Sequence, residues 1–249
     1  MKCVDSPVRV EVLATVDSTN DHLLKKAASA QRHFMVCCAE SQTHGRGRGG
    51  HRWVSPANGN IYLSLMTPRM PRHACWLSLI AAALLADRLQ QWGVPRIGVK
   101  WPNDILYDGR LKLAGLLLDN RLGSCVIGLG FNMHLPTTTS NNTLPPNCTA
   151  LDQIVDRRFD RNELAGQLAA TLIDAFHQTD QSDVSQLMTI WRRHDLLKGR
   201  SLFFIDKERK PCRGTVLGVD EKACLSYLDH QGRQKFLTTL DSSPSYAKT

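Results

Sequence analysis

The residues best suited to chemistry lie in a glycine- and arginine-rich segment between Glu40 and Gly59. This segment holds five glycines, and it holds three arginines, Arg46, Arg48 and Arg52. Glycine lets a backbone approach a ligand closely, although each glycine costs conformational entropy when the segment becomes ordered. Arginine supplies a fixed, planar set of donors that matches phosphate or carboxylate, whereas lysine is a mobile point charge. We therefore expect a loop that closes over an anion.

The letters of this segment also fit other kinds of site. Gly45 to Gly50 matches the dinucleotide pattern G-x-G-x-x-G, but that pattern needs a helix directly after the glycines, and here Pro56 and a second turn follow. A kinase glycine loop would need H-R-D and D-F-G elements downstream, and the sequence has neither. An RGG-like nucleic-acid segment and a solvated flexible loop stay open. The rest of the chain has to decide between them.

Three further clusters stand at the ends of expected strands. Lys100-Trp101-Pro102-Asn103-Asp104 brings an amide and a carboxylate to a proline-fixed turn, where α/β proteins usually hold ligands. Lys112 lies in an otherwise apolar run, so its ammonium must reach solvent or meet an anion. A lysine on the exposed face of an edge strand fits equally well. Asn132 ends the stretch Gly128-Leu129-Gly130-Phe131-Asn132, and an ordinary turn asparagine would explain it too.

The elements that must position these clusters alternate along the chain. Asp17-Ser18-Thr19-Asn20 offers helix-capping side chains after the first expected strand. The expected strands are Val8–Leu13, Phe34–Ala39, Ile61–Met66, Ile97–Trp101, Leu111–Leu118 and Cys125–Phe131, and the expected helices are His22–Ala30, Ala74–Trp92, one through Leu164, Leu168, Leu172 and Phe176, and Val184–His194. After Gly199 the pattern changes to short strands separated by turns, as in a small barrel. We place a domain boundary near Asp195, giving domains 1–195 and 196–249.

The composition limits the possible classes of protein but does not identify one. The chain has 249 residues, 42% of them hydrophobic, which is ample for a buried core. Its net charge of +8 permits nucleic acid, anionic lipid or phosphorylated partners. The eight cysteines form no C-x-x-C pair, the histidines show no zinc spacing, and the apolar run from Cys75 to Ala86 is too short to cross a bilayer. We expect reduced thiols, a cytoplasmic location and no membrane partner.

Taken in chain order, five motifs resemble those of the biotin protein ligases. They are Asp17-Ser18-Thr19-Asn20, Gly45-Arg46-Gly47-Arg48-Gly49-Gly50-His51-Arg52-Trp53, Lys100-Trp101-Pro102-Asn103-Asp104, Lys112-Leu113-Ala114-Gly115 and Gly128-Leu129-Gly130-Phe131-Asn132. The resemblance implies an α+β fold, in which a mixed β-sheet is flanked by helices as in class II synthetases. It also implies a small C-terminal SH3-like β-barrel, which the stretch from Gly199 to Leu240 matches loosely. Lipoate ligases and octanoyl transferases share the catalytic fold, but the glycine-arginine loop and the Lys100 to Asp104 turn look like the biotin branch.

The resemblance also implies an activity and a set of site residues. The family activates biotin with MgATP to biotinyl-5′-adenylate and pyrophosphate, and then transfers biotin to one lysine of a biotin carboxyl carrier domain. The implied catalytic residues are Lys112, Arg48 and Asp104. The implied biotin-binding residues are Ser18, Thr19, Asn20, Gln42, Gly45, Arg46, Lys112 and Gly115. The implied ATP and adenylate contacts are Arg46, Arg48, Arg52, Trp53, Asn103, Lys112 and Asn132.

The resemblance leaves several properties of the chain open. Mg²⁺ is expected with ATP, but no protein ligands for it can be named from the sequence. The chain starts at the first catalytic strand, so we expect no N-terminal DNA-binding domain and no nucleic-acid partner. A nucleic-acid binder is the alternative, and it would show salt-sensitive binding to polynucleotide without any dependence on biotin.

The family includes monomers and sheet-to-sheet dimers, which leaves a homodimer open. Asp119 and Ala223 depart from the commoner glutamate and glycine, and the loop from Thr137 to Asn147 has no clear counterpart.

Overall fold

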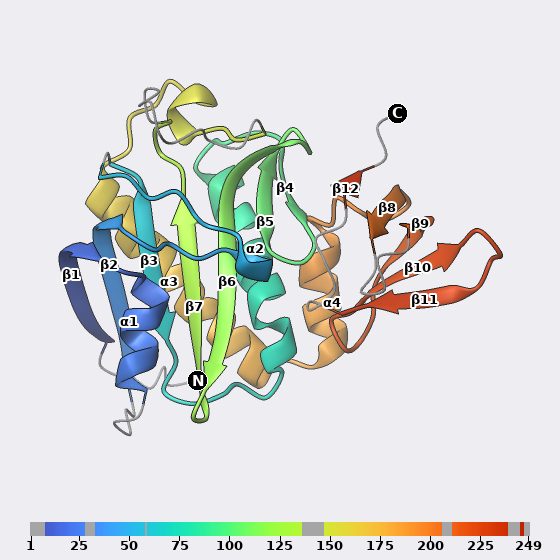
Figure 1. The fold of residues 1–249 in the computed structure, drawn as a ribbon, viewed down its shortest axis with the longest axis horizontal. Helices are drawn as coiled ribbons and strands as arrows, with labels where there is room; N and C mark the ends of the chain where they lie inside the picture. Colours follow the sequence, from blue (N-terminus) through green and yellow to red (C-terminus); the bar gives the residue numbers. More distant parts are fainter. Residues whose placement is uncertain are drawn as a thin grey trace.

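The structure, a computed structural model, describes residues 8–27, 33–57, 59–135, 147–205, 211–238 and 245–246 (Figure 1). Its larger part is a seven-stranded sheet with the strand order β1-β2-β3-β7-β6-β5-β4. β1 and β2 run parallel, and every other neighbouring pair is antiparallel. The strands are β1 (Val8–Val16), β2 (Phe34–Gln42), β3 (Ile61–Met66), β4 (Ile97–Lys100), β5 (Asp104–Tyr107), β6 (Leu111–Arg121) and β7 (Ser124–Phe131). The expected mixed sheet is confirmed.

Helices cover the two faces of this sheet unequally. α1 (Thr19–Lys26) lies on one face, over a small apolar cluster that includes Leu23, Met35 and Val126. The other face packs against α2 (Leu77–Gln91) and α3 (Arg161–Gln181), and α4 (Val184–Arg192) packs against α2. The described residues of the larger part also form three short 3₁₀ helices, η1 (Arg48–Gly50), η2 (Ala74–Trp76) and η3 (Leu151–Gln153).

The first helix differs from its expected limits, and one observed strand was not expected. The first helix begins at Thr19, because Ser18 caps it by accepting a hydrogen bond from the Asp21 backbone N–H, and its expected end at Ala30 lies outside the described residues. β5 was not expected from the sequence. It is a four-residue strand that follows directly on the cis Trp101–Pro102 turn and pairs with β4 and β6. So short a run between two turns carries little periodicity of its own.

The C-terminal strands form a second sheet, with the order β11-β10-β9-β8-β12. They are β8 (Ser201–Ile205), β9 (Pro211–Val219), β10 (Leu225–Asp229), β11 (Gln234–Leu237) and β12 (Ser245–Tyr246). The expected small SH3-like barrel is not closed in the described residues, because the edge strands β11 and β12 are not paired with each other. Instead of enclosing a core of its own, the sheet adds Leu202, Val216 and Leu225 to the main apolar cluster.

Two buried tryptophans join the C-terminal sheet to the larger part. Trp76 and Trp101 donate their indole N–H groups to the backbone oxygens of Glu221 and Ala223, at 3.0 and 3.2 Å. Both acceptors lie in the turn between β9 and β10. The division into domains 1–195 and 196–249 stays a prediction. Of the loop from Thr137 to Asn147, only Asn147 is described, and within the described ranges no helix could cross a membrane.

Candidate active site

A cavity of about 340 Å³ lies on the sheet face that carries α1. The segment between β2 and β3, which includes η1, passes in front of β7 and β6 and covers this cavity (Figure 1). Every residue predicted for the site lines it except Gly45: Ser18, Thr19, Asn20, Gln42, Arg46, Arg48, Arg52, Trp53, Asn103, Asp104, Lys112, Gly115 and Asn132. Residues separated by more than a hundred positions in the sequence therefore surround a single space.

One half of the cavity is walled by a connected set of small polar side chains. The Gln42 side-chain oxygen accepts hydrogen bonds from the Thr19 backbone N–H at 2.9 Å and from the Thr19 hydroxyl at 3.2 Å. The Ser64 hydroxyl lies 2.7 Å from Thr19 Oγ1 and 2.6 Å from Asn20 Oδ1. Gln42 in turn donates to Ser55 Oγ at 2.9 Å. Since Thr19, Asn20 and Ser64 are buried, these side chains are held in fixed orientations.

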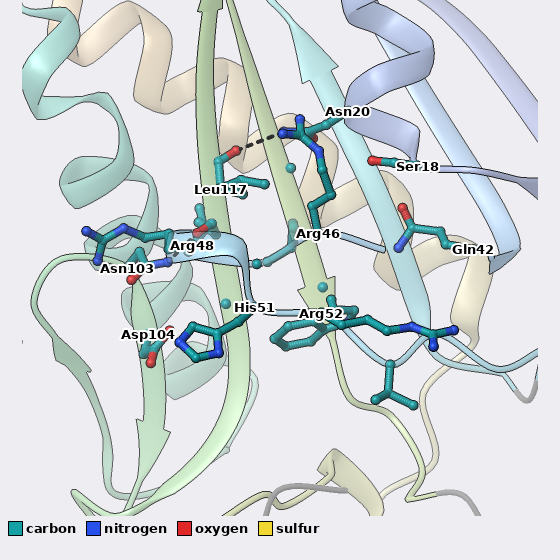
Figure 2. Close-up of a pocket in the computed structure, with 18 of the residues that line it drawn as sticks. Ser18, Asn20, Gln42, Arg46, Arg48, His51, Arg52, Asn103, Asp104 and Leu117 are labelled. Carbon is teal, nitrogen blue, oxygen red and sulfur yellow. Dashed lines mark hydrogen bonds between the residues drawn. The ribbon is translucent and has the colours of Figure 1, made fainter. Parts of the chain in front are cut away.

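Arg46 also lines this half of the cavity, and two carboxylates hold its guanidinium. Its guanidinium lies 2.6 Å from Asp119 Oδ2 and 2.9 Å from Asp21 Oδ1. Asp119 also accepts a hydrogen bond from the Asn20 side-chain amide at 2.9 Å, and that amide donates to the Leu117 backbone oxygen at 3.2 Å. Figure 2 shows Arg46 extending from the loop to the region of Asn20. Asp119 therefore ties the loop to the wall of the cavity, a role that the sequence did not indicate.

The glycine-arginine loop is held in shape by its own backbone. Gly47 N–H donates to the His51 oxygen at 2.7 Å, and Trp53 N–H donates to the Gly45 oxygen at 2.9 Å. Gly49 and Gly50 have φ values of 61° and 78°, in the left-handed region that glycine adopts without strain. Gly45 does not line the cavity. It is packed so tightly that a Cβ there would meet the Trp53 oxygen at 2.5 Å, so it serves the path of the loop.

The other half of the cavity carries two of the three predicted catalytic residues, Lys112 and Asp104. Lys112 Nζ lies 2.7 Å from Asp104 Oδ1 and 5.1 Å from the centre of the Trp53 ring system. β5 and β6 are neighbouring strands, and Asp104 of β5 lies opposite Gly115 of β6. Lys112 is also on β6, and its side chain reaches Asp104. The pair is partly buried, with 29% and 20% of the two side chains exposed. The ammonium is thus neither on an open edge nor alone, because Asp104 is its counterion.

Glycines of β6 and β7 form the floor on which Trp53 lies. A Cβ at Gly130 would stand 2.5 Å from Trp53 Nε1, and one at Gly115 would stand 2.9 Å from Lys112 Cε and 3.1 Å from Trp53 Cζ3. A Cβ at Gly128 would likewise stand 2.9 Å from Asn20 Cγ. The sequence contained the signal in Gly128-Leu129-Gly130, but only the register of β7 against the loop explains it.

The three arginines of the loop have different surroundings. Arg48 extends towards Asn103 and Asp104, whereas Arg52 points to the opposite side of the cavity (Figure 2). Burial lowers the pKa of the Arg48 guanidinium, and the negative charge of Asp104 acts in the other direction. Arg52 donates a hydrogen bond to the Thr43 backbone oxygen at 3.2 Å. Arg46 and Arg48 therefore face the cavity with fixed positive charge, and Arg52 fastens the loop to the end of β2.

Backbone contacts fix the amide side chains at the rim. Asn103 donates its amide to the Leu116 backbone oxygen. Asn132 donates to the backbone oxygens of Thr149 and Lys112, at 3.1 and 3.4 Å, so its side-chain oxygen is the group it can offer to a ligand. The segment after the undescribed loop returns here, because Lys112 N–H donates to the Asn147 oxygen at 2.7 Å. This pairing brings Cys148 into the lining, which the sequence did not predict.

The cavity offers few side chains that could hold a metal ion. Asp104 is the single acidic residue among the residues that line it. In the described part of the chain, no group of three or more histidine, cysteine, aspartate or glutamate side chains gathers closely enough to hold a metal ion. A site with one carboxylate suits an ion that keeps most of its water or binds to a phosphorylated ligand. The cysteines in the described ranges form no disulfide.

Comparisons with known proteins place this geometry in context. Residues 12–132 match the biotin/lipoate A/B protein ligase family. The chain is 36% identical over 232 residues to the biotin–[acetyl-CoA-carboxylase] ligase of Paracoccus denitrificans, covering 90% of this chain and 95% of that protein. It is 32% identical over 225 residues to the bifunctional ligase/repressor BirA of Escherichia coli K12, covering 87% and 68%. Among solved structures, a biotin protein ligase from Aquifex aeolicus in complex with biotin and ATP superposes with a TM-score of 0.79 and 22% identity, covering 97% and 99%.

Proposed function

Because this chain belongs to the biotin protein ligases of the biotin/lipoate A/B protein ligase family, we propose that its cavity joins biotin to AMP and then to a carrier lysine. The observation that carries this proposal is the division of one cavity into two unlike halves. One half has a fixed set of neutral hydrogen-bonding groups around Thr19 and Gln42, and the other has the cations Lys112 and Arg48. A bicyclic urea with a carboxylate tail, followed by a nucleotide phosphate, fits that order of chemistry.

The neutral half supports binding of the biotin ring system. Its ureido edge has both donors and acceptors. Thr19, Asn20 and Gln42 line the cavity, and their hydrogen bonds with one another and with the buried Ser64 hold them in fixed positions. Leu117 and Leu129 add apolar lining for the thiophane ring and the acyl chain. Arg46, fastened by Asp21 and Asp119, would cover the bound ring. Lipoate and octanoate lack the ureido group, so they would leave these polar groups unpaired, which costs binding energy.

The cationic half supports the adenylation step. A carboxylate oxygen of biotin attacks the α-phosphorus of ATP. A new O–P bond forms, and the bond from the α-phosphorus to the pyrophosphate oxygen breaks. Negative charge accumulates on the α-phosphate oxygens and on the leaving group, so preorganised cations should lower the barrier. Lys112, in the cationic half, is the side chain that would contact both the carboxylate and the α-phosphate. Arg48, turned into the same space, would hold the departing phosphates.

Adenine and Mg²⁺ can be placed by the same reasoning. Trp53 offers an aromatic surface beside Lys112, and the Asn132 side-chain oxygen could accept from the adenine amino group. Mg²⁺ prefers oxygen ligands and usually combines one or two carboxylates with substrate phosphates and water. Asp104, the acid of the cavity, would be its protein ligand. When bound, the ion would neutralise phosphate charge.

The second step transfers the biotinyl group to the carrier. A neutral lysine amine attacks the acyl carbonyl, an amide bond forms, AMP leaves, and the amine loses a proton. Asp104 is the carboxylate beside the reacting groups and would attract the incoming ammonium or accept that proton. The positive charge of the chain would favour docking of an acidic carrier domain. We further propose that the reaction takes place in the cytoplasm.

The direct test uses purified protein with MgATP and one of three acids: biotin, lipoate or octanoate. We expect pyrophosphate release with biotin, and a mass gain of one biotinyl group on an added biotin carboxyl carrier domain. A carrier whose acceptor lysine is replaced by arginine should show no mass gain. Pyrophosphate release with lipoate alone would mean that the site activates an acid, but that the acid is not biotin. No pyrophosphate release with any of the three acids would overturn the proposal.

A further inference from the structure

A second lysine lies beside Asp104, and no step of the proposed reaction uses it. Lys100 is the last residue of β4, and its Cα is the register partner of the Asp104 Cα. The turn between them is closed by a hydrogen bond from the Asn103 backbone N–H to the Lys100 oxygen, at 3.1 Å. Directly opposite residues of an antiparallel pair project their side chains to the same face, with Cβ atoms about 4.5–5.5 Å apart. Lys100 and Asp104 are therefore neighbours on one face of the sheet.

That face is the floor of the cavity. The pairing register continues from Asp104 to Gly115 of β6, and from Gly115 to Gly130 of β7. Lys100 thus stands in one row with these two glycines of the cavity lining, although Lys100 itself does not line the cavity. It is partly buried, and Asp104 lies between it and the glycine floor.

The Asp104 carboxylate is shared between ammonium groups on two strands. Lys112 of β6 has its Nζ 2.7 Å from Asp104 Oδ1, and Lys100 stands on the β4 side. Burial lowers the pKa of Lys100, the charge of Asp104 acts in the opposite direction, and the charge of Lys112 adds to the lowering. Lys100 is thus close enough to both groups for their charges to act on it. Since Arg48 also extends towards Asp104, one carboxylate serves several cations (Figure 2).

The adenylation step needs Lys112 to turn away from this carboxylate. An ammonium held by a carboxylate at 2.7 Å has less of its charge to offer to a phosphate. Once Lys112 has turned, Asp104 is a partly buried negative charge beside a polyanionic substrate, and a carboxylate without a counterion is costly in such a place. A second cation at Asp104 reduces this cost.

We propose that Lys100 is a positioning residue of the adenylation step: it holds the Asp104 carboxylate while Lys112 turns to the substrate. The inference rests on the proposed function, because Lys112 is the side chain that would contact the reacting groups. An ionised carboxylate has two oxygens and about four acceptor sites, so Asp104 can hold Lys100 and still offer an oxygen to Mg²⁺. Without Lys100, Asp104 keeps its hold on Lys112, and the adenylate forms more slowly.

The first test is the single-turnover rate of biotin-dependent pyrophosphate release in Lys100→Met and Lys100→Arg. Methionine keeps the apolar stem of the side chain and removes the charge, so the fold should be kept. We expect Lys100→Met to lower the rate by about 10- to 100-fold while the biotin KM changes less than about threefold, and Lys100→Arg to keep at least about a third of the rate. Lys198→Met is the control, because Lys198 is exposed, and it should change neither quantity.

A double variant separates a hold on Asp104 from a direct contact between Lys100 and the phosphates. Asp104→Asn has no charge with which to hold Lys112, so in this background Lys100→Met should lower the rate by no more than about threefold. A full loss of rate in that background would overturn the proposal, because it would mean that Lys100 acts on the substrate or on the fold. A normal rate for Lys100→Met in the unaltered background would overturn it too.

The last test needs no activity and reads Lys112 directly. The chain without substrates is treated with an amine-acylating reagent, and the modification of Lys112 is followed by peptide mass mapping. An ammonium held more tightly by a carboxylate loses its proton less readily, so we expect Lys112 to react at least about threefold more slowly in Lys100→Met. An equal rate would overturn this inference alone. If the unaltered chain releases no pyrophosphate with biotin, the proposed function fails instead, and the inference fails with it.

Discussion

The indole of Trp53 rests on Gly130, so closely that a Cβ at position 130 would stand 2.5 Å from Trp53 Nε1. Trp53 belongs to the loop that covers the cavity, and Gly130 belongs to β7 in the middle of the sheet. The loop therefore reaches the sheet floor only because that floor has no side chain at this position. The same indole faces Lys112 at 5.1 Å, so its placement also positions the side chain expected to contact the reacting phosphate.

Replacing Gly130 should therefore damage nucleotide binding more than biotin binding. In Gly130→Ala the new methyl group displaces Trp53, and we expect the KM for ATP to rise by about tenfold or more. The KM for biotin should stay within about twofold, because the Thr19–Gln42 hydrogen bonds are not in contact with the substitution. Gly166→Ala on α3 is the control, since a Cβ there meets nothing within 4 Å. Equal changes for both substrates would contradict this account.

Asp119 should act on biotin binding through Arg46 and Asn20. Asp119→Asn keeps the shape of the side chain and removes the charge that holds the Arg46 guanidinium at 2.6 Å. We expect the KM for biotin to rise about three- to tenfold, the size of one charged hydrogen bond that is partly exposed, with little change for ATP. Steady-state kinetics at two salt concentrations measure both. Asp174→Asn removes a surface pair with Arg88 and should change neither substrate constant. An unchanged biotin KM in Asp119→Asn would show that the ion pair does not hold the loop.

The turn between β6 and β7 offers a gain in stability. Leu122 and Gly123 form a two-residue turn in which both residues have positive φ, 50° and 81°. Asparagine tolerates this conformation far better than leucine, and Leu122 is 68% exposed, so little apolar burial is lost. Leu122→Asn should raise the free energy of unfolding by about 0.5–1 kcal/mol, measured by urea denaturation. Leu122→Ala tests the cause, because it shortens the side chain without relieving the backbone and should give no such gain.

Much of the site was predictable from the sequence because its residues stand in short, distinctive clusters. A packed core does not need the residue types that occur in the glycine-arginine loop and in the Lys100 to Asp104 turn. It also does not need a lysine such as Lys112 inside an apolar run. Their expected strands were also close to those observed, as in β3, whose predicted and observed limits are both Ile61 and Met66. The sequence alone could not assign roles, and the roles of these residues stay predictions.

Other features depend on contacts between distant parts of the chain. Asp119 meets Asn20 across 99 positions, and Cys148 enters the cavity because Lys112 pairs with its neighbour Asn147. Neither relationship leaves a local pattern. The C-terminal barrel was expected from the spacing of short strands, which is the same whether the sheet closes on itself or, as here, packs its apolar side into the main core. Local spacing cannot distinguish these two outcomes.

The central claim is that the Lys112 ammonium stabilises the transition state of adenylate formation. The measurement is the single-turnover rate of biotin-dependent pyrophosphate release by Lys112→Ala, beside the unaltered chain and the surface variant Lys222→Ala. Lys112 is 29% exposed, so the fold should tolerate its loss, and circular dichroism checks this. We predict a rate lower by about 100- to 1000-fold in Lys112→Ala, the cost of removing one preorganised charge, with Lys222→Ala unchanged. A folded Lys112→Ala protein that forms the adenylate at nearly the normal rate would contradict the account.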